Sequence, residues 1–173
     1  MNQKTEPQLT QLAELMQTEC SNMLRYACCR LGDREEARDA LQDVYLSVHS
    51  QICSDRGIRI LDLKSYFFRT LANYCIDRLQ SRAKTTLLSL DDVPDVADMP
   101  NEYTEKDYAR VTMVLATLPD EQAEGIRLRI YAEKSFVEIA AILALPLSTV
   151  KSRFIYGLKK MRMKIDRNEF LPI

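Results

Sequence analysis

Histidine, tryptophan, glycine and long apolar runs are scarce or absent in this sequence, and each scarcity excludes something. The 173 residues include one histidine, His49, and no tryptophan, so histidine-based catalysis and zinc–histidine sites are unfavourable. Four glycines and six prolines are too few for a turn-rich all-β protein. The longest apolar run, residues 139–147, has nine residues, whereas a membrane span needs about 20. We therefore expect no membrane insertion.

Two further features indicate a reducing compartment. Residues 1–7 are polar and lack the basic and apolar segments of a secretory signal. The five cysteines are odd in number and irregularly spaced, which fits a reducing cytosol better than a disulfide scaffold. They show no metal-ligand spacing, and Cys28 and Cys75 fall at expected core positions. We expect a cytoplasmic protein with no metal and no other cofactor.

Charge is balanced overall but unevenly distributed along the chain. The net charge of −1 gives no reason by itself to expect nucleic-acid binding. Residues 56–84 hold seven basic and two acidic residues, residues 91–107 hold one basic and seven acidic residues, and residues 148–167 hold seven basic residues and one acidic residue. Basic patches attract phosphates, although each block taken alone fits a solvated surface equally well.

Apolar periodicity predicts an all-α chain with two small helical domains. In the first half we expect helices over residues 8–31, from about 34 to 50, and over 63–82, the last one capped by Asp62. In the second half we expect helices over 106–117, from Pro119 to about 131, 136–143 and 149–166. Residues 84–105 hold two prolines and most of the acids, so we interpret them as a linker between domains at 8–83 and 106–167.

The last two predicted helices form a helix-turn-helix pattern. Ser135 and Glu138 have capping-box spacing, four residues separate the helices, and Ser148 is the expected N-cap of the second helix. The buried stripe of that helix is predicted to be Val150, Phe154, Leu158 and Met161. Ala144 replaces the usual turn glycine, so either it adopts a positive φ or the turn shifts. An ordinary helical hairpin with a basic surface is the alternative.

Five short segments occur in order along the chain. They are A-R-D-A-L-Q-D-V-Y-L (37–46), Y-F-F-R-T-L-A-N-Y-C-I-D-R (66–78), L-P-D-E-Q (118–122), S-F-V-E-I-A (135–140) and S-T-V-K-S-R (148–153). Together they resemble regions 2 and 4 of the extracytoplasmic-function (ECF) sigma factors of the sigma-70 family, over about residues 10–165. The sequence departs from that pattern at Arg38, Tyr66, Ala123, Tyr156 and Leu158.

The resemblance assigns two sets of residues in the first domain. Asp39, Gln42 and Asp43 share a helix face and by resemblance dock on the β′ clamp of RNA polymerase; from spacing alone a solvated face is the better interpretation. By resemblance the −10 promoter element is read by Tyr66, Asn73, Asp77 and Arg78.

The residues assigned to the −10 element leave two questions open. Tyr66 is the best candidate for an exposed aromatic side chain, since at least one of Phe67 and Phe68 should lie in the core. Asp77 could equally hold Arg78 or Arg82 in an ion pair.

A third set lies near the start of the last helix. By resemblance the residues that bind the −35 element are Ser148, Thr149, Lys151, Ser152, Arg153, Tyr156 and Lys160. Lys159 and Lys160 lie further along and suit phosphate contacts. Arg153 has a structural alternative, an ion pair with Glu138.

These motifs together predict a promoter-specificity factor that is not an enzyme. It would bind bacterial core RNA polymerase, through the β′ clamp and the β flap, and direct initiation at −35 and −10 elements of promoter DNA. An anti-sigma factor is a further partner that the resemblance suggests. A conventional helix-turn-helix regulator acting without polymerase is the alternative. A helical adaptor or a cysteine enzyme fits less well, because no nucleophile–base pair is evident.

Overall fold

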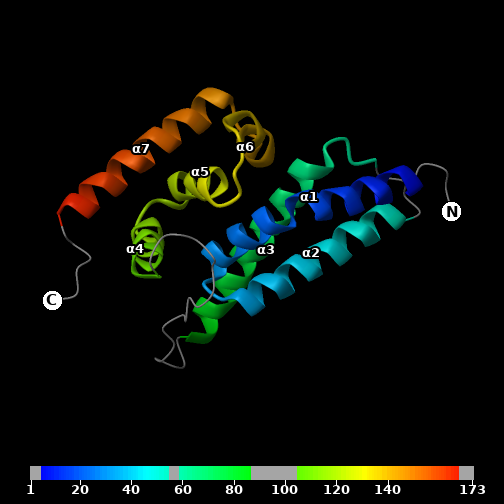
Figure 1. Ribbon diagram of the computed structural model, residues 1–173, viewed down its shortest axis with the longest axis horizontal. Coiled ribbons are helices and arrows are strands. Elements are labelled where there is room, and N and C mark those ends of the chain that lie inside the picture. The colour runs from blue at the N-terminus through cyan, green and yellow to red at the C-terminus, as the bar shows by residue number, and fades with distance from the viewer. Residues whose placement is uncertain (1–4, 55–58, 87–104, 168–173) are drawn as a thin grey trace. The chain divides into compact units, whose positions relative to one another are not determined.

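The helices form two compact units, α1–α3 and α4–α7 (Figure 1). The structure is a computed structural model that describes residues 5–54, 59–86 and 105–167, and the elements within those ranges are all helical. In that part of the chain, no single helix is both long and apolar enough to cross a membrane. The all-α prediction is therefore confirmed for the described residues.

The first unit packs three helices against one another: α1 (Thr5–Leu31), α2 (Arg34–Cys53) and α3 (Leu63–Thr86). Its core contains the fully buried side chains of Leu12, Met23, Tyr26, Phe67 and Phe68. Both phenylalanines that follow Tyr66 are thus core residues, and Tyr66 itself is only partly buried.

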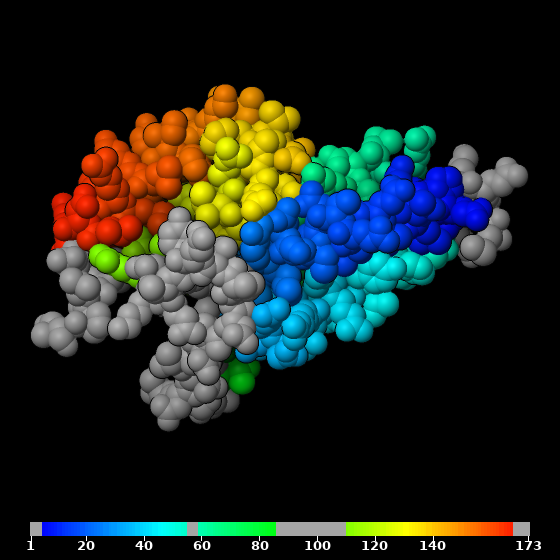
Figure 2. Space-filling view, in the orientation of Figure 1, coloured from blue at the N-terminus to red at the C-terminus, as the bar shows by residue number. Residues whose placement is uncertain are grey.

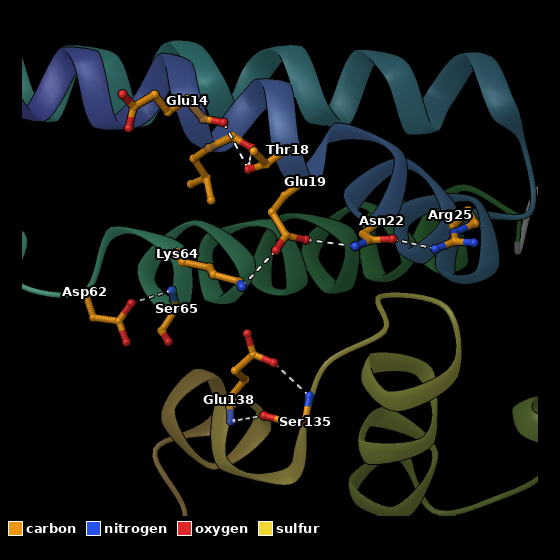
Figure 3. Close-up of polar contacts among 11 residues, drawn as sticks. Glu14, Thr18, Glu19, Asn22, Arg25, Asp62, Lys64, Ser65, Ser135 and Glu138 are labelled. Atoms are coloured by element: carbon orange, nitrogen blue, oxygen red, sulfur yellow. Dashed lines mark hydrogen bonds and ion pairs between the residues drawn. The ribbon is translucent and has the colours of Figure 1, made fainter.

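Local signals set the ends of these helices. Gly32 ends α1 with a φ of 75°, which a residue without a Cβ adopts at no steric cost. Asp33 caps α2, because its side chain accepts a hydrogen bond from the Glu36 backbone N–H at 2.8 Å. Asp62 caps α3 by accepting from the Ser65 N–H at 3.0 Å (Figure 3). The predicted cap at Asp62 is thus confirmed.

The end of α3 differs from the prediction. The helix continues past Arg82 to Thr86, since residues 83–86 contain no glycine or proline to stop it. The predicted linker of residues 84–105 is therefore described only at its two ends, which belong to α3 and α4. Its interior, residues 87–104, lies outside the described residues.

The prediction of core cysteines is wrong at one position. Cys75 is fully buried, but Cys29 rather than Cys28 is the buried member of the adjacent pair. Cys28 is half-buried because it lies one position around α1 from the side that packs on the other helices.

The second unit contains α4 (Glu105–Ala116), α5 (Asp120–Ile130), α6 (Phe136–Leu143) and α7 (Leu147–Asp166). Buried apolar side chains from all four helices form its core, including Leu115, Ile126, Ile139 and Val150. The helix α7 packs on α4, α5 and α6. It therefore depends on the whole unit for its position.

Candidate nucleic-acid interface

The turn between α6 and α7 has helix-turn-helix geometry. The chain bends by 107° between the two helices, within the range of that motif. Ser135 accepts a hydrogen bond from the Glu138 N–H at 3.2 Å, and the Glu138 carboxylate accepts from the Ser135 N–H at 2.8 Å (Figure 3). The predicted capping box is thus confirmed, and it fixes the start of α6.

Ala144 closes α6 in the left-handed region, with φ 53° and ψ 46°. Its N–H and that of Leu145 both donate to the Ala140 carbonyl oxygen. Of the two alternatives for this alanine, the structure therefore has the positive φ. An alanine in this region carries a strain of about 1 kcal/mol.

Ser148 is not the N-cap of α7, contrary to the prediction. Pro146 occupies that position, with φ −58° and ψ 143°, and its carbonyl oxygen accepts the first helical bond from the Val150 N–H at 3.1 Å. Proline fits there because its fixed φ suits the position and it has no N–H that needs a partner. Ser148 lies in the first turn and is exposed.

The inner face of α7 meets α5 at a glycine. A Cβ added at Gly157 would lie 2.8 Å from Ile126 Cδ1 and 3.4 Å from the Gln122 carbonyl oxygen. Val150, Gly157 and Met161 are buried, whereas Leu158 is 41% exposed. The predicted stripe was wrong at Leu158, because the position that faces α5 is the preceding one, Gly157, where the close approach leaves no room for a side chain.

The outer face of α7 carries most of the predicted −35 readers. Ser148, Lys151, Ser152 and Tyr156 are exposed, and α7 runs along the surface of its unit (orange to red in Figure 2). Ile155 lies between them and is 62% exposed, close to the 60% of Tyr156. Sequence reasoning missed Ile155, although its spacing of three and four residues from Ser152 and Lys151 could have identified it.

Arg153 lies at the side of α7 rather than on this outer face. Its Nη2 lies 2.9 Å from Glu121 Oε2 of α5, and its side chain is 29% exposed. The structural partner is therefore Glu121 and not Glu138, whose carboxylate caps α6 instead. Thr149 and Lys160 are also partly buried, which places them at the margin of the outer face.

The −10 candidates on α3 divide between two faces. Spacings of seven and four residues put Tyr66, Asn73 and Asp77 on one face, and the last two are exposed. Arg78 is exposed too, but it follows Asp77 by one residue and so lies about 100° around the helix. The structure does not bring all four side chains together on one strip.

Neighbouring ion pairs hold this helix in place. Lys64 Nζ, in its first turn, lies 2.8 Å from Glu19 Oε1 of α1, and Asn22 donates to the other Glu19 oxygen at 2.9 Å (Figure 3). At its other end Arg82 pairs with Glu36 and donates to the Leu31 carbonyl oxygen. Arg82 is thus held by Glu36, so the alternative of an Asp77–Arg82 pair is not what the structure shows.

The acidic face of α2 consists of Asp39, Gln42 and Asp43, which are all exposed. Asp43 Oδ2 accepts a hydrogen bond from the Tyr74 hydroxyl of α3 at 2.5 Å. This hydrogen bond, followed by burial and the Asp43 charge, raises the pKa of Tyr74, and Arg78 and Asp39 lie close enough to influence it. This hydrogen bond therefore links the surface of Asp39, Gln42 and Asp43 to the side of α3.

In the described ranges, neither the cysteines nor the acidic groups build a metal site. Within the described residues, no group of three or more His, Cys, Asp or Glu side chains could hold a metal ion. Burial raises the pKa of the Cys28 thiol, which makes it less reactive than a free cysteine.

Comparisons with known proteins agree on one family. The family model described as "Sigma-70, region 4" matches residues 114–163. The ECF RNA polymerase sigma factor SigM of Mycobacterium tuberculosis is 33% identical over 119 residues, which cover 69% of this chain and 59% of that protein. SigK of Mycobacterium bovis BCG is 29% identical over 147 residues, covering 79% of this chain and 75% of SigK. The chain thus spans less than two thirds of SigM.

Solved structures share the fold. The sigma factor RpoE of Bartonella quintana, crystallised with the anti-sigma factor NepR, has a TM-score of 0.65 at 22% identity, covering 90% of this chain and 96% of RpoE. CnrH, in complex with the cytosolic domain of CnrY, has a TM-score of 0.67 at 18% identity, covering 96% of this chain and 94% of CnrH.

Proposed function

The chain belongs to the ECF group of the sigma-70 family, and we propose that it is a promoter-specificity factor that binds core RNA polymerase. In this proposal residues 8–83 act as region 2 and residues 106–167 as region 4. The observation that supports it best is α7, whose inner face is seated on α5 while its outer face exposes polar, basic and aromatic side chains. The polymerase performs the chemistry, so the factor needs no catalytic residue of its own.

The −35 element is read by the outer face of α7. The N-terminal part of a recognition helix enters the major groove, where Lys151 can pair with guanine and Ser152 can contact several base edges. The apolar surfaces of Ile155 and Tyr156 suit the methyl group of thymine. Arg153 supports α7 through Glu121, and Thr149, Lys159 and Lys160 contact the phosphates beside the groove.

The −10 element is held by α3. Melted DNA presents bases that stack on aromatic side chains, and Tyr66 lies next to the exposed Asn73–Asp77 face. The amide of Asn73 can pair with a base edge, and Asp77 makes no ion pair within the described residues, which leaves its carboxylate available. Arg78, which lies about 100° around the helix from Asp77, is better suited to a phosphate.

Core polymerase docks on Asp39, Gln42 and Asp43, which offer carboxylates and an amide to a basic helix of the β′ clamp, while the second domain contacts the β flap. Replacing both Asp39 and Gln42 by Ala should cost about 1–3 kcal/mol of core affinity. Glu14→Ala, which removes an exposed acid from α1, is the matched control and should change nothing. An anti-sigma factor is a further partner in this proposal. The chain itself is proposed to act in the cytoplasm.

Reconstituted transcription tests the proposal. The purified chain is added to bacterial core polymerase on a library of promoter sequences, and the transcript starts are sequenced. Starts at one promoter class, absent with core alone, would support a sigma factor. Binding to a palindromic site without any new starts would instead favour a conventional helix-turn-helix regulator.

A further inference from the structure

The hydrogen bond between Tyr74 and Asp43 joins two helices that the proposed function uses differently. Asp43 lies on α2, on the acidic face, and Tyr74 lies on α3 beside Asn73. The Tyr74 hydroxyl donates to Asp43 Oδ2 at 2.5 Å, across 31 residues of sequence. Two turns further along α3, Arg82 pairs with Glu36 of α2, so the two contacts fix the antiparallel register of these helices.

Asp43 differs from its neighbours on the acidic face. Asp39 and Gln42 are exposed and make no hydrogen bond or ion pair among the described residues, so their side chains must be ordered when a partner binds. The Asp43 carboxylate is already held by Tyr74. Ordering a side chain in advance reduces the loss of freedom on association.

Holding Asp43 does not use up its capacity to bind. A carboxylate has two oxygens with about four acceptor positions, and Tyr74 occupies one position on Oδ2. Because its pKa is raised, the Tyr74 phenol remains a protonated donor at any physiological pH. The carboxylate therefore stays oriented by Tyr74 and open to a basic partner through its other oxygen.

From this geometry we propose that Tyr74 is a positioning residue for polymerase docking, which fixes the Asp43 carboxylate in its binding orientation and links the docking face to α3. The inference rests on the proposed function, since it needs a basic partner at the acidic face. It adds a residue of α3 to a face that sequence reasoning confined to α2.

A double-mutant cycle with Tyr74→Phe and Asp43→Ala tests this role. Equilibrium binding of fluorescently labelled full-length chain to core polymerase is measured for the wild type, each single variant and the pair. Tyr74→Phe should weaken binding about threefold to tenfold and should have no further effect once Asp43 is alanine. Tyr45→Phe, which alters a tyrosine of α2 that lies beside His49, is the control and should bind like the wild type.

Two outcomes would overturn the inference. Either Tyr74→Phe binds core as tightly as the wild type, or it weakens binding equally with and without the Asp43 carboxylate, in which case Tyr74 acts through packing alone. The −35 DNA binding by the free chain should not change in Tyr74→Phe. If the wild-type chain does not bind core polymerase, the proposed function fails. The inference then fails as well, and the wild-type measurement identifies this as the reason.

Discussion

Gly157 allows the sharpest prediction, because the structure shows what a methyl group there would meet. In Gly157→Ala the new Cβ would lie 2.8 Å from Ile126 Cδ1, closer than real Cβ atoms approach other heavy atoms. Ile126 is 2% exposed, so its side chain has little room to withdraw. Inserting a methyl group into a packed core costs about 1–3 kcal/mol, while alanine gains about 1 kcal/mol over glycine inside a helix. We expect a net loss of about 1 kcal/mol.

Gly125 provides the matched control within the neighbouring helix. A Cβ at Gly125 of α5 would meet nothing within 4 Å, so Gly125→Ala should gain the helical contribution alone, about 1 kcal/mol. The two substitutions are chemically identical and should change stability in opposite directions. A third variant, Ile126→Val, removes the Cδ1 atom at a cost of about 0.5–1.5 kcal/mol, and in that background Gly157→Ala should no longer destabilise.

Urea unfolding followed by circular dichroism gives the stabilities, and hydrogen exchange of the α5 and α7 amides assigns the change to the second unit. If Gly157→Ala stabilises the protein as much as Gly125→Ala does, α5 and α7 do not approach as closely as described. If Gly157→Ala costs the same stability in the wild-type background and in the Ile126→Val background, Ile126 Cδ1 is not the obstacle.

Three further predictions follow from single residues. Ala144→Gly should stabilise the protein by about 1 kcal/mol in thermal unfolding, since glycine removes the strain of a positive φ; no gain would mean an unstrained turn. Hydrogen bonds from the Ser65 side chain and N–H lower the pKa of Asp62 below 3.8, so this cap should stabilise α3 above about pH 3.8 and lose its effect as the pH falls through the lower folded-state value. Asp62→Ala should therefore reduce stability at neutral pH and approach the wild type in strong acid, as acid titration by circular dichroism can check. In binding assays over −35 variants, Ile155→Ala should change the ranking of sites, whereas Arg153→Ala should weaken all sites alike and keep the ranking; a changed ranking with Arg153→Ala would make it a base reader.

Helix boundaries could be predicted from the sequence wherever the signal is local. The caps at Asp33, Asp62 and Ser135 each bond to a residue three positions away, so a few neighbouring residues contain all the information. The order of helix, turn and helix in α6 and α7 could be predicted for the same reason, because its signals are also local. The outward position of Asp39 and Asp43 followed as well, because helical periodicity alone separates a polar face from an apolar one.

Features that depend on contact between two helices were decided by the tertiary structure. Leu158 is apolar enough for a core, but α5 comes so close to α7 that only Gly157 fits at the crossing. Serine is a better cap than proline by preference, yet Pro146 caps α7 because the left-handed Ala144 directs the chain into the helix two residues earlier. The partners of Arg153 and Asp43 lie on other helices, 32 and 31 residues away. Periodicity orders the residues of one helix, whereas contacts between helices depend on distances in space that no local pattern contains.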